Sequence, residues 1–269
     1  MKFGWCATLK DVDLIMQAGF DYIELPLAAQ GLEDRATFDA SKKAIAASPL
    51  PAAAFNYFMP RDMRVVGPNI DVVRVKTYLA RAAELLGSAG ARSCVFGAAW
   101  ARNIADDWQR ERAEEQFLET LVWCADALQG TGVTLAIEPL YRKESNFINS
   151  VAEGVHFARQ INRPEIRVLA DFFHMDEENE PFDTLIEHRQ WLAHIHLADT
   201  GRKNPGTGSY PYAQFFGALK QAGYDRLMSC ECSVDDPATG LRHSVNFLRQ
   251  RWSEQSADQP PLARDTARQ

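Results

Sequence analysis

The sequence predicts a single-domain (β/α)8 TIM barrel, and three observations support this fold class. The chain has 269 residues, 46% of them hydrophobic, which suits one large core. Short apolar runs alternate with amphipathic helical stretches along the chain, as in parallel βα units. No glycine-rich phosphate loop follows the first apolar run, which argues against the main alternative, an open doubly wound sheet. We expect residues 1–252 to form the barrel and residues 253–269 to form a flexible polar tail.

Eight short runs, apolar and bounded by turn residues, are the expected strands. They span residues 2–6, 20–25, 52–56, 92–97, 133–138, 166–171, 193–198 and 227–232. Helical patterns fill the intervals between them. Several of these patterns end in a glycine just before the next strand, which is the usual C-cap position of a helix. These glycines are Gly19, Gly90, Gly130 or Gly132, and Gly223.

Residue alternation within the strands predicts which side chains enter the barrel. In the fifth run Ala136 and Glu138 share a face of small or polar residues, whereas the bulky residues between them would face the helices. In the eighth run the same alternation places Glu231 inside and leaves Cys230 and Cys232 outside, as packing residues. Both glutamates are therefore expected to point into the barrel.

The last four predicted strands end in residues that can bind a metal ion. Glu138, Asp171, His196 and Glu231 lie at the carboxyl ends of strands five to eight, where barrels of this class carry their active sites. Neighbouring strands are about 4.8 Å apart, so three carboxylates in this arc would repel one another strongly without a counter-charge. The sequence therefore predicts that the four residues bind one divalent cation.

The ligand set of three carboxylates and one imidazole favours Mn²⁺, with Mg²⁺, Co²⁺ and Zn²⁺ as alternatives. His194 lies two residues before His196 and faces the same way, one layer deeper. We interpret His194 as a core histidine hydrogen-bonded beneath the metal site, where it could also orient a ligand carboxylate.

Four segments resemble the xylose-isomerase-like superfamily of sugar isomerases and epimerases, and within it the ketose 3-epimerases of the D-tagatose and D-psicose type. They are IEPLYRKESNF, LADFFHMDEEN, HIHLADTGRKNPGTG and MSCECS. The resemblance implies the same four metal ligands, with Glu138 and Glu231 as the acid and base. It also implies that the residues at the family's substrate-binding offsets, Glu144, His174 and Arg202, contact the substrate.

The activity implied by this resemblance is metal-dependent removal of a proton next to a carbonyl, through an enediolate, and most specifically ketose 3-epimerisation. Isomerisation of a hydroxypyruvate-like acid and epimerisation or elimination on a keto-sugar or inosose remain open, because the first half of the chain matches the family only in outline. The substrate is expected to be a small sugar or keto-polyol. A dimer or tetramer is implied by the resemblance alone.

Charge and composition exclude several other functions. A net charge of −7 and a pI near 5.4 argue against nucleic acid as a partner. An abasic-site endonuclease on this fold would need histidines at the ends of strands two and three, where Glu24 and Asn56 lie. A non-catalytic sugar-binding protein would not need two opposed glutamates. Five scattered cysteines and the lack of a long apolar segment predict a cytoplasmic protein with free thiols that does not enter the membrane.

Overall fold

A computed structural model of the chain, in which residues 1–256 are described, shows a closed barrel of eight parallel strands in sequence order. Strand β1 pairs with both β2 and β8, which closes the sheet. The predicted fold class is therefore confirmed. The strands are β1 (Lys2–Cys6), β2 (Tyr22–Pro26), β3 (Ala52–Asn56), β4 (Ser93–Phe96), β5 (Thr134–Ile137), β6 (Ile166–Asp171), β7 (Leu192–Leu197) and β8 (Leu227–Cys230).

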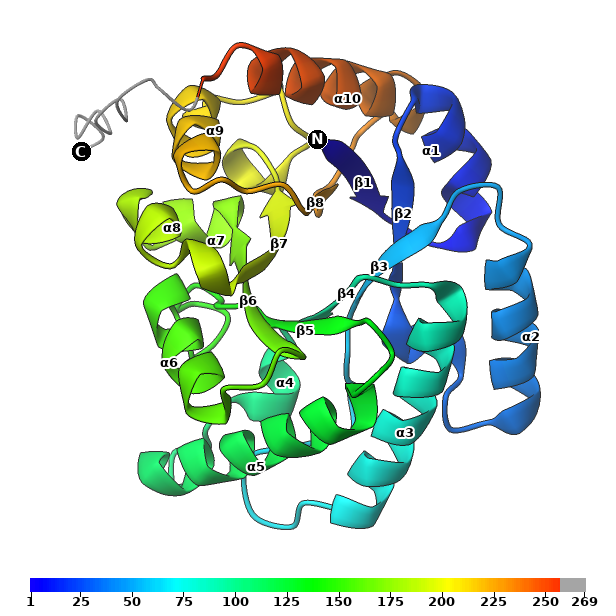
Figure 1. Cartoon of the computed structure of the whole chain (residues 1–269), viewed down its shortest axis with the longest axis vertical. Coiled ribbons are helices and arrows are strands. Elements are labelled where there is room, and N and C mark those ends of the chain that lie inside the picture. The colour runs from blue at the N-terminus through cyan, green and yellow to red at the C-terminus, as the bar shows by residue number, and fades with distance from the viewer. Residues whose placement is uncertain (257–269) are drawn as a thin grey trace.

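Helices surround the strands on the outside of the barrel, and Figure 1 shows this ring with the strands at its centre. The principal helices are α1 (Val12–Ala18), α2 (Arg35–Ala46), α3 (Val72–Ala89), α5 (Arg110–Leu128), α6 (Val151–Ile161), α9 (Tyr212–Gln221) and α10 (Pro237–Ser253). There are also three shorter helices. Two of them, α4 (Ala99–Arg102) and α7 (Phe172–Glu177), follow the carboxyl ends of β4 and β6, and the third, α8 (Asp183–Glu187), packs on α9 and α6. Helix α10 packs on α1 and α9, so the last helix covers the seam between the two ends of the barrel.

Local sequence signals set the helix ends. Asp34, Asp71 and Ser150 each accept a hydrogen bond at a helix N-terminus, from the backbone N–H three residues later. Gly19 and Gly90 adopt the left-handed conformation after α1 and α3, as their predicted C-cap role requires.

The main core lies between the strands and the helices, and it contains the outward-facing side chains of the strands, Cys230 among them. The barrel interior is a separate environment. Small apolar clusters there, such as Ala136 with Val95, Leu169 and Ala193, occupy the inward positions that alternation predicts. Because the strands are parallel, all their carboxyl ends meet at one mouth of the barrel, where the polar residues gather.

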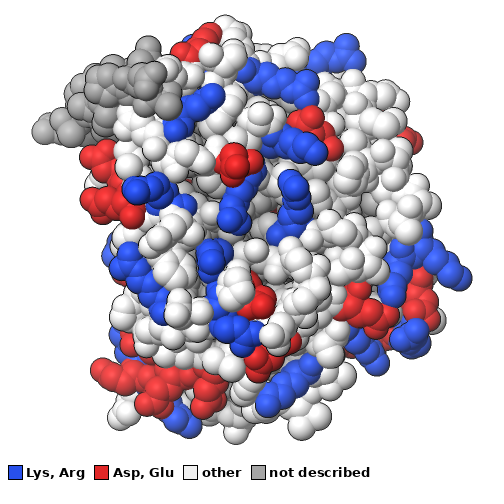
Figure 2. All heavy atoms as spheres, viewed as in Figure 1, with Lys and Arg blue, Asp and Glu red and all other residues white. Residues whose placement is uncertain are grey.

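In the part of the chain that the structure describes, no helix is both long and apolar enough to cross a bilayer. Acidic and basic side chains are interspersed over the face seen in Figure 2 rather than gathered into one basic patch. The segment expected to form a polar tail lies outside the described residues from position 257 onward, and α10 extends through Ser253.

Candidate metal and sugar site

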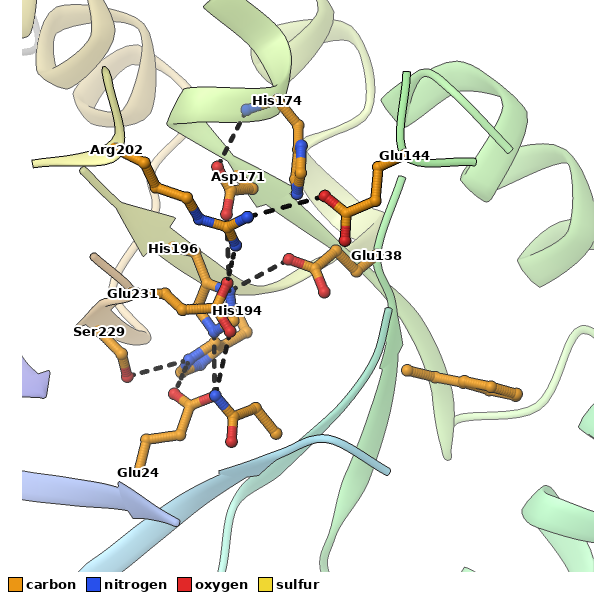
Figure 3. A network of polar contacts seen from close by, with 12 residues as sticks. Glu24, Glu138, Glu144, Asp171, His174, His194, His196, Arg202, Ser229 and Glu231 are labelled. Atoms are coloured by element: carbon orange, nitrogen blue, oxygen red, sulfur yellow. Dashed lines mark hydrogen bonds and ion pairs between the residues drawn. The ribbon is translucent and has the colours of Figure 1, made fainter. Parts of the chain in front are cut away.

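The four predicted metal ligands converge at the barrel mouth (Figure 3). One potential ligand atom from each of Glu138, Asp171, His196 and Glu231 lies within 4.8 Å of the others. The Nδ1 atom of His196 is 3.2 Å from a carboxylate oxygen of Glu138, 3.5 Å from one of Glu231 and 3.7 Å from one of Asp171. The structure therefore brings these residues to one point, with His196 Nδ1 facing all three acids.

Strand ends position the four side chains. Glu138 and Glu231 each follow the last residue of a strand, and their N–H groups continue the sheet by donating to Phe96 and Leu197 at 3.2 Å and 3.0 Å. Asp171 closes β6 and also begins α7, because its Oδ1 accepts from the N–H of His174 at 3.1 Å. That hydrogen bond fixes the carboxylate and leaves Oδ2 directed toward His196.

Three carboxylic acids surround the imidazole of His196, and their proximity and burial shift the pKa values of the cluster. Burial raises the pKa of Glu138, and the charges of Glu231 and Asp171 raise it further. Burial also opposes ionisation of Glu231, but the charges of His196 and Arg202 outweigh it and hold the pKa of Glu231 below its usual range. Burial opposes charging of His196 as well, yet the surrounding carboxylates raise its pKa well above 6.5. Without a cation, a proton on His196 provides part of the missing positive charge.

Two residues that the sequence analysis did not single out hold Glu138 in place. A Cβ atom on Gly97 would lie 1.8 Å from Glu138 Oε2, so only glycine leaves room for the carboxylate there. Arg102, fully buried on α4, donates to the backbone carbonyl of Phe96 at 3.0 Å and to that of Glu138 at 2.5 Å. The turn after β4 thus supports the predicted ligand at the end of β5.

The three predicted substrate-binding residues lie around the same point (Figure 3). Arg202 donates to Glu231 at 2.5 Å, and its other terminal nitrogen lies 3.7 Å from a carboxylate oxygen of Glu144. His174 is buried on α7, where its Nδ1 accepts from the N–H of Tyr141 at 3.3 Å. A neutral His174 then carries its proton on Nε2, which has no partner among the described residues and can donate to a bound molecule.

A layer of polar residues lies directly below the four predicted metal ligands. Glu24 on β2 is fully buried, and its two carboxylate oxygens lie 2.9 Å from His196 Nε2 and 2.8 Å from His194 Nε2. His194 Nε2 is also 3.2 Å from the hydroxyl of Ser229, which in turn lies 2.7 Å from the hydroxyl of Tyr22. Burial opposes ionisation of Glu24, but the two histidines outweigh it and lower its pKa.

Glu24 was not among the predicted site residues, although the sequence carries a signal for it. Tyr22 and Glu24 alternate on β2 as Ala136 and Glu138 do near β5, so Glu24 is an inward carboxylate by the same rule. Asn56 at the end of β3 was also passed over, and its amide donates to Glu231 at 3.1 Å. These two positions carry a carboxylate and an amide instead of the histidines that an abasic-site endonuclease would need.

An open cleft reaches Glu231 in two lobes, with volumes of about 520 Å³ and 360 Å³, and the smaller lobe also reaches Glu138. Both lobes are lined by Asn56, Tyr57, Arg202 and Glu231. Tyr57 is 46% exposed, has a φ of 44°, and stacks on Trp100 with ring centroids 6.0 Å apart. The cleft therefore offers charged groups at its floor and an aromatic wall above them, a combination suited to a polyhydroxylated ligand. Cys232, expected to pack against helices, is partly buried against the main core and also lines the larger lobe.

The donor set fits a divalent cation. Three carboxylates and one neutral imidazole nitrogen supply oxygen and nitrogen ligands of the kind that Mn²⁺, Mg²⁺, Co²⁺ and Zn²⁺ accept. Burial, and after it the charges of Glu231 and Asp171, raise the pKa of Glu138, and a bound cation would favour its ionised form.

Comparison with known proteins gives the family. The family model described as xylose isomerase-like TIM barrel matches residues 12–251. The chain belongs to this family. The prediction made from the four sequence segments is therefore confirmed.

Curated relatives are named as sugar epimerases. The chain is 27% identical over 245 residues to the ketose 3-epimerase of Arthrobacter globiformis, covering 88% of this chain and 82% of that one. It is 26% identical over 186 residues to the 3-dehydro-D-guloside 4-epimerase of Escherichia coli K12, covering 64% and 69%. The D-psicose 3-epimerase of Ruminiclostridium cellulolyticum is 32% identical over 162 residues, covering 59% and 52%.

Solved structures show the same fold. A 3-keto-D-glucoside 4-epimerase from Escherichia coli superposes with a TM-score of 0.80 at 24% identity, covering 93% of this chain and 99% of that one. A D-psicose 3-epimerase with D-tagatose from Clostridium cellulolyticum also gives 0.80, at 18% identity, covering 94% and 99%.

Proposed function

We propose that this protein is a divalent-metal-dependent sugar epimerase that inverts the carbon next to a ketose carbonyl, most specifically C3. Its relatives named as epimerases support an isomerase or epimerase as the enzyme class. The observation that carries the proposal is the convergence of Glu138, Asp171, His196 and Glu231 within 4.8 Å, with Glu138 and Glu231 lining an open cleft.

A divalent cation held by these four residues would polarise the substrate carbonyl and so acidify the neighbouring C–H bond. The remaining chemistry belongs to the side chains. Glu138 and Glu231 enter from β5 and β8, at the two ends of the four-strand arc, so they flank a substrate placed between them. One carboxylate removes the proton from carbon, and the other returns a proton to the opposite face, which inverts the centre.

Other residues at the cleft floor orient the substrate. Arg202 lies between Glu231 and Glu144, so it fixes the direction of one acid–base carboxylate and presents its guanidinium to hydroxyl groups. His174 presents a donor at Nε2 for a carbonyl or hydroxyl oxygen. Removing either group should raise KM and lower kcat, because both contacts position the reacting carbon.

A test combines cation binding with exchange of carbon-bound hydrogen. Metal-free protein is incubated with ketoses in deuterium oxide, with and without Mn²⁺, and the products are analysed by NMR. We expect deuterium at the carbon next to the carbonyl and a 3-epimer as product, only with the cation present. Glu138→Gln and Glu231→Gln should each reduce the exchange rate by at least about 100-fold, which is the lower end of the range expected when a general acid or base is lost.

The matched control for His196→Asn is His156→Asn, at an exposed position of α6. Unlike the loss of His196, this substitution should leave activity and cation binding unchanged. Wild-type protein that binds the cation but exchanges no hydrogen with any carbonyl sugar would contradict the proposal.

A second candidate is a 4-epimerase of keto-glycosides. It is favoured by the relative named 3-dehydro-D-guloside 4-epimerase and by the combined volume of the two lobes of the cleft, both of which Tyr57 lines. The same panel, extended to keto-glycosides, keto-inositols and a hydroxypyruvate-like acid, distinguishes the candidates by which substrate exchanges its proton and which product forms.

A further inference from the structure

The side chain of Glu24 is hydrogen-bonded to two histidines in the interior of the barrel, and only one of them, His196, faces the cluster of predicted metal ligands. His196 Nε2 points to Glu24 at 2.9 Å, whereas His196 Nδ1 points to the three carboxylates at 3.2 to 3.7 Å (Figure 3). A cation at the cluster can therefore be bound only through Nδ1. That requires a lone pair on Nδ1 and, in a neutral ring, the proton on Nε2.

We propose that Glu24 is a positioning residue that holds His196 in the tautomer able to bind the cation. This inference rests on the proposed metal site. The ionised carboxylate accepts a hydrogen bond from Nε2, which keeps the proton on that nitrogen and the ring in its observed orientation. Without this acceptor, the proton can move to Nδ1 and be donated to Glu138, which lies 3.2 Å away, and it then competes with the cation.

His194 keeps Glu24 in position. Its Nε2 donates to the second carboxylate oxygen at 2.8 Å, so both oxygens of Glu24 are satisfied although the side chain is fully buried. The hydroxyls of Ser229 and Tyr22 continue this chain of contacts away from the cluster. Residues on three strands of the sheet, β2, β7 and β8, contribute to this arrangement.

A different interpretation of the same residues is a second metal site, because Cys6, Glu24 and His196 also lie within 4.8 Å of one another. That site would need a Glu24 oxygen and His196 Nε2 as ligands. Both oxygens of Glu24 already accept from imidazoles, and His196 Nε2 is one of those donors. The geometry therefore favours a hydrogen-bonding role for Glu24.

The test measures the tautomer of His196 and the affinity for the cation. Protein labelled with ¹⁵N-histidine is saturated with diamagnetic Zn²⁺, and the ring nitrogens are assigned by NMR. We expect the wild-type His196 to carry its proton on Nε2, with one-bond N–H coupling and slow exchange with water. A proton on Nδ1 in the loaded wild-type protein would overturn the proposal, and this readout does not depend on how any variant folds.

The variants give the second measurement. Glu24→Met keeps the length of the side chain and removes both acceptors, so Mn²⁺ affinity measured by titration should fall about 10- to 100-fold, as for other residues that orient a metal-binding histidine. Tyr22→Phe, at the far end of the same buried chain, is the control and should change the affinity by less than about twofold. Unchanged affinity in Glu24→Met would refute the role of Glu24 while leaving the metal site intact, whereas failure of wild type to bind Mn²⁺ would refute the metal site itself.

Discussion

Replacing Gly97 by alanine should disable the site without unfolding the barrel. The added Cβ would lie 1.8 Å from Glu138 Oε2, and Cβ contacts in proteins are essentially never shorter than 3.0 Å. The carboxylate must therefore move by about 1.2 Å, the difference between these two distances. A misplacement of about 1 Å at a reacting centre costs on the order of 100-fold in rate, or about 2.7 kcal/mol of transition-state stabilisation.

The assay is the initial rate of deuterium incorporation into the ketose with saturating Mn²⁺, together with Mn²⁺ affinity and the urea midpoint of each protein. Gly87→Ala in α3 is the matched control, since the nearest side-chain atoms to its new Cβ are 3.7 Å away. It should keep full activity and gain about 0.5–1 kcal/mol of stability. If Gly97→Ala kept wild-type activity, this prediction would be refuted, because catalysis would then not require the Glu138 carboxylate in its observed position.

Three further predictions concern stability. Arg102→Leu should destabilise the fold by about 2–5 kcal/mol in urea unfolding, because it leaves two buried carbonyls, one of them that of Glu138, without a donor. In EDTA, the raised pKa of His196 should stabilise the protein fully below about pH 6.5 and progressively less as the pH rises toward the raised value, a slope that His196→Asn should abolish. Asp171→Asn should keep the cap of α7 and raise stability in EDTA, because one charge fewer then acts on Glu138, and it should abolish the stabilisation by Mn²⁺. A loss of stability in EDTA would contradict this expectation.

The barrel and the cluster at its mouth could be predicted because both follow from short-range patterns. Strand length, alternation and C-cap glycines define the βα units, and the closure of the barrel brings consecutive strand ends such as Asp171 and His196 together. Once the parity of each strand is known, Glu138 and Glu231 can point only inward.

The supporting contacts could not be predicted in the same way. Glu24 is separated from His194 and His196 by 170 and 172 residues, so no local pattern pairs them. Arg102 lies on the short helix α4 within a stretch that carries no helical periodicity of its own. The requirement for glycine at position 97 depends on the rotamer of a glutamate on the next strand. Each of these depends on packing between segments distant in sequence.

The charges at the barrel mouth indicate where a cation is most needed. Glu24 is compensated by two imidazoles, and Glu231 by Arg202 and the amide of Asn56. Among the described residues, the cationic group within 4 Å of Glu138 and Asp171 is His196 Nδ1, at 3.2 Å and 3.7 Å, and the charge of Arg202 acts on both carboxylates from farther away. Because the imidazole of His196 also faces Glu24 and Glu231, it is shared among four acids, and the carboxylates at the mouth repel one another when no cation is bound. Removing the charge of Asp171 should relieve that repulsion, and the same change removes the reason for a divalent ion to bind.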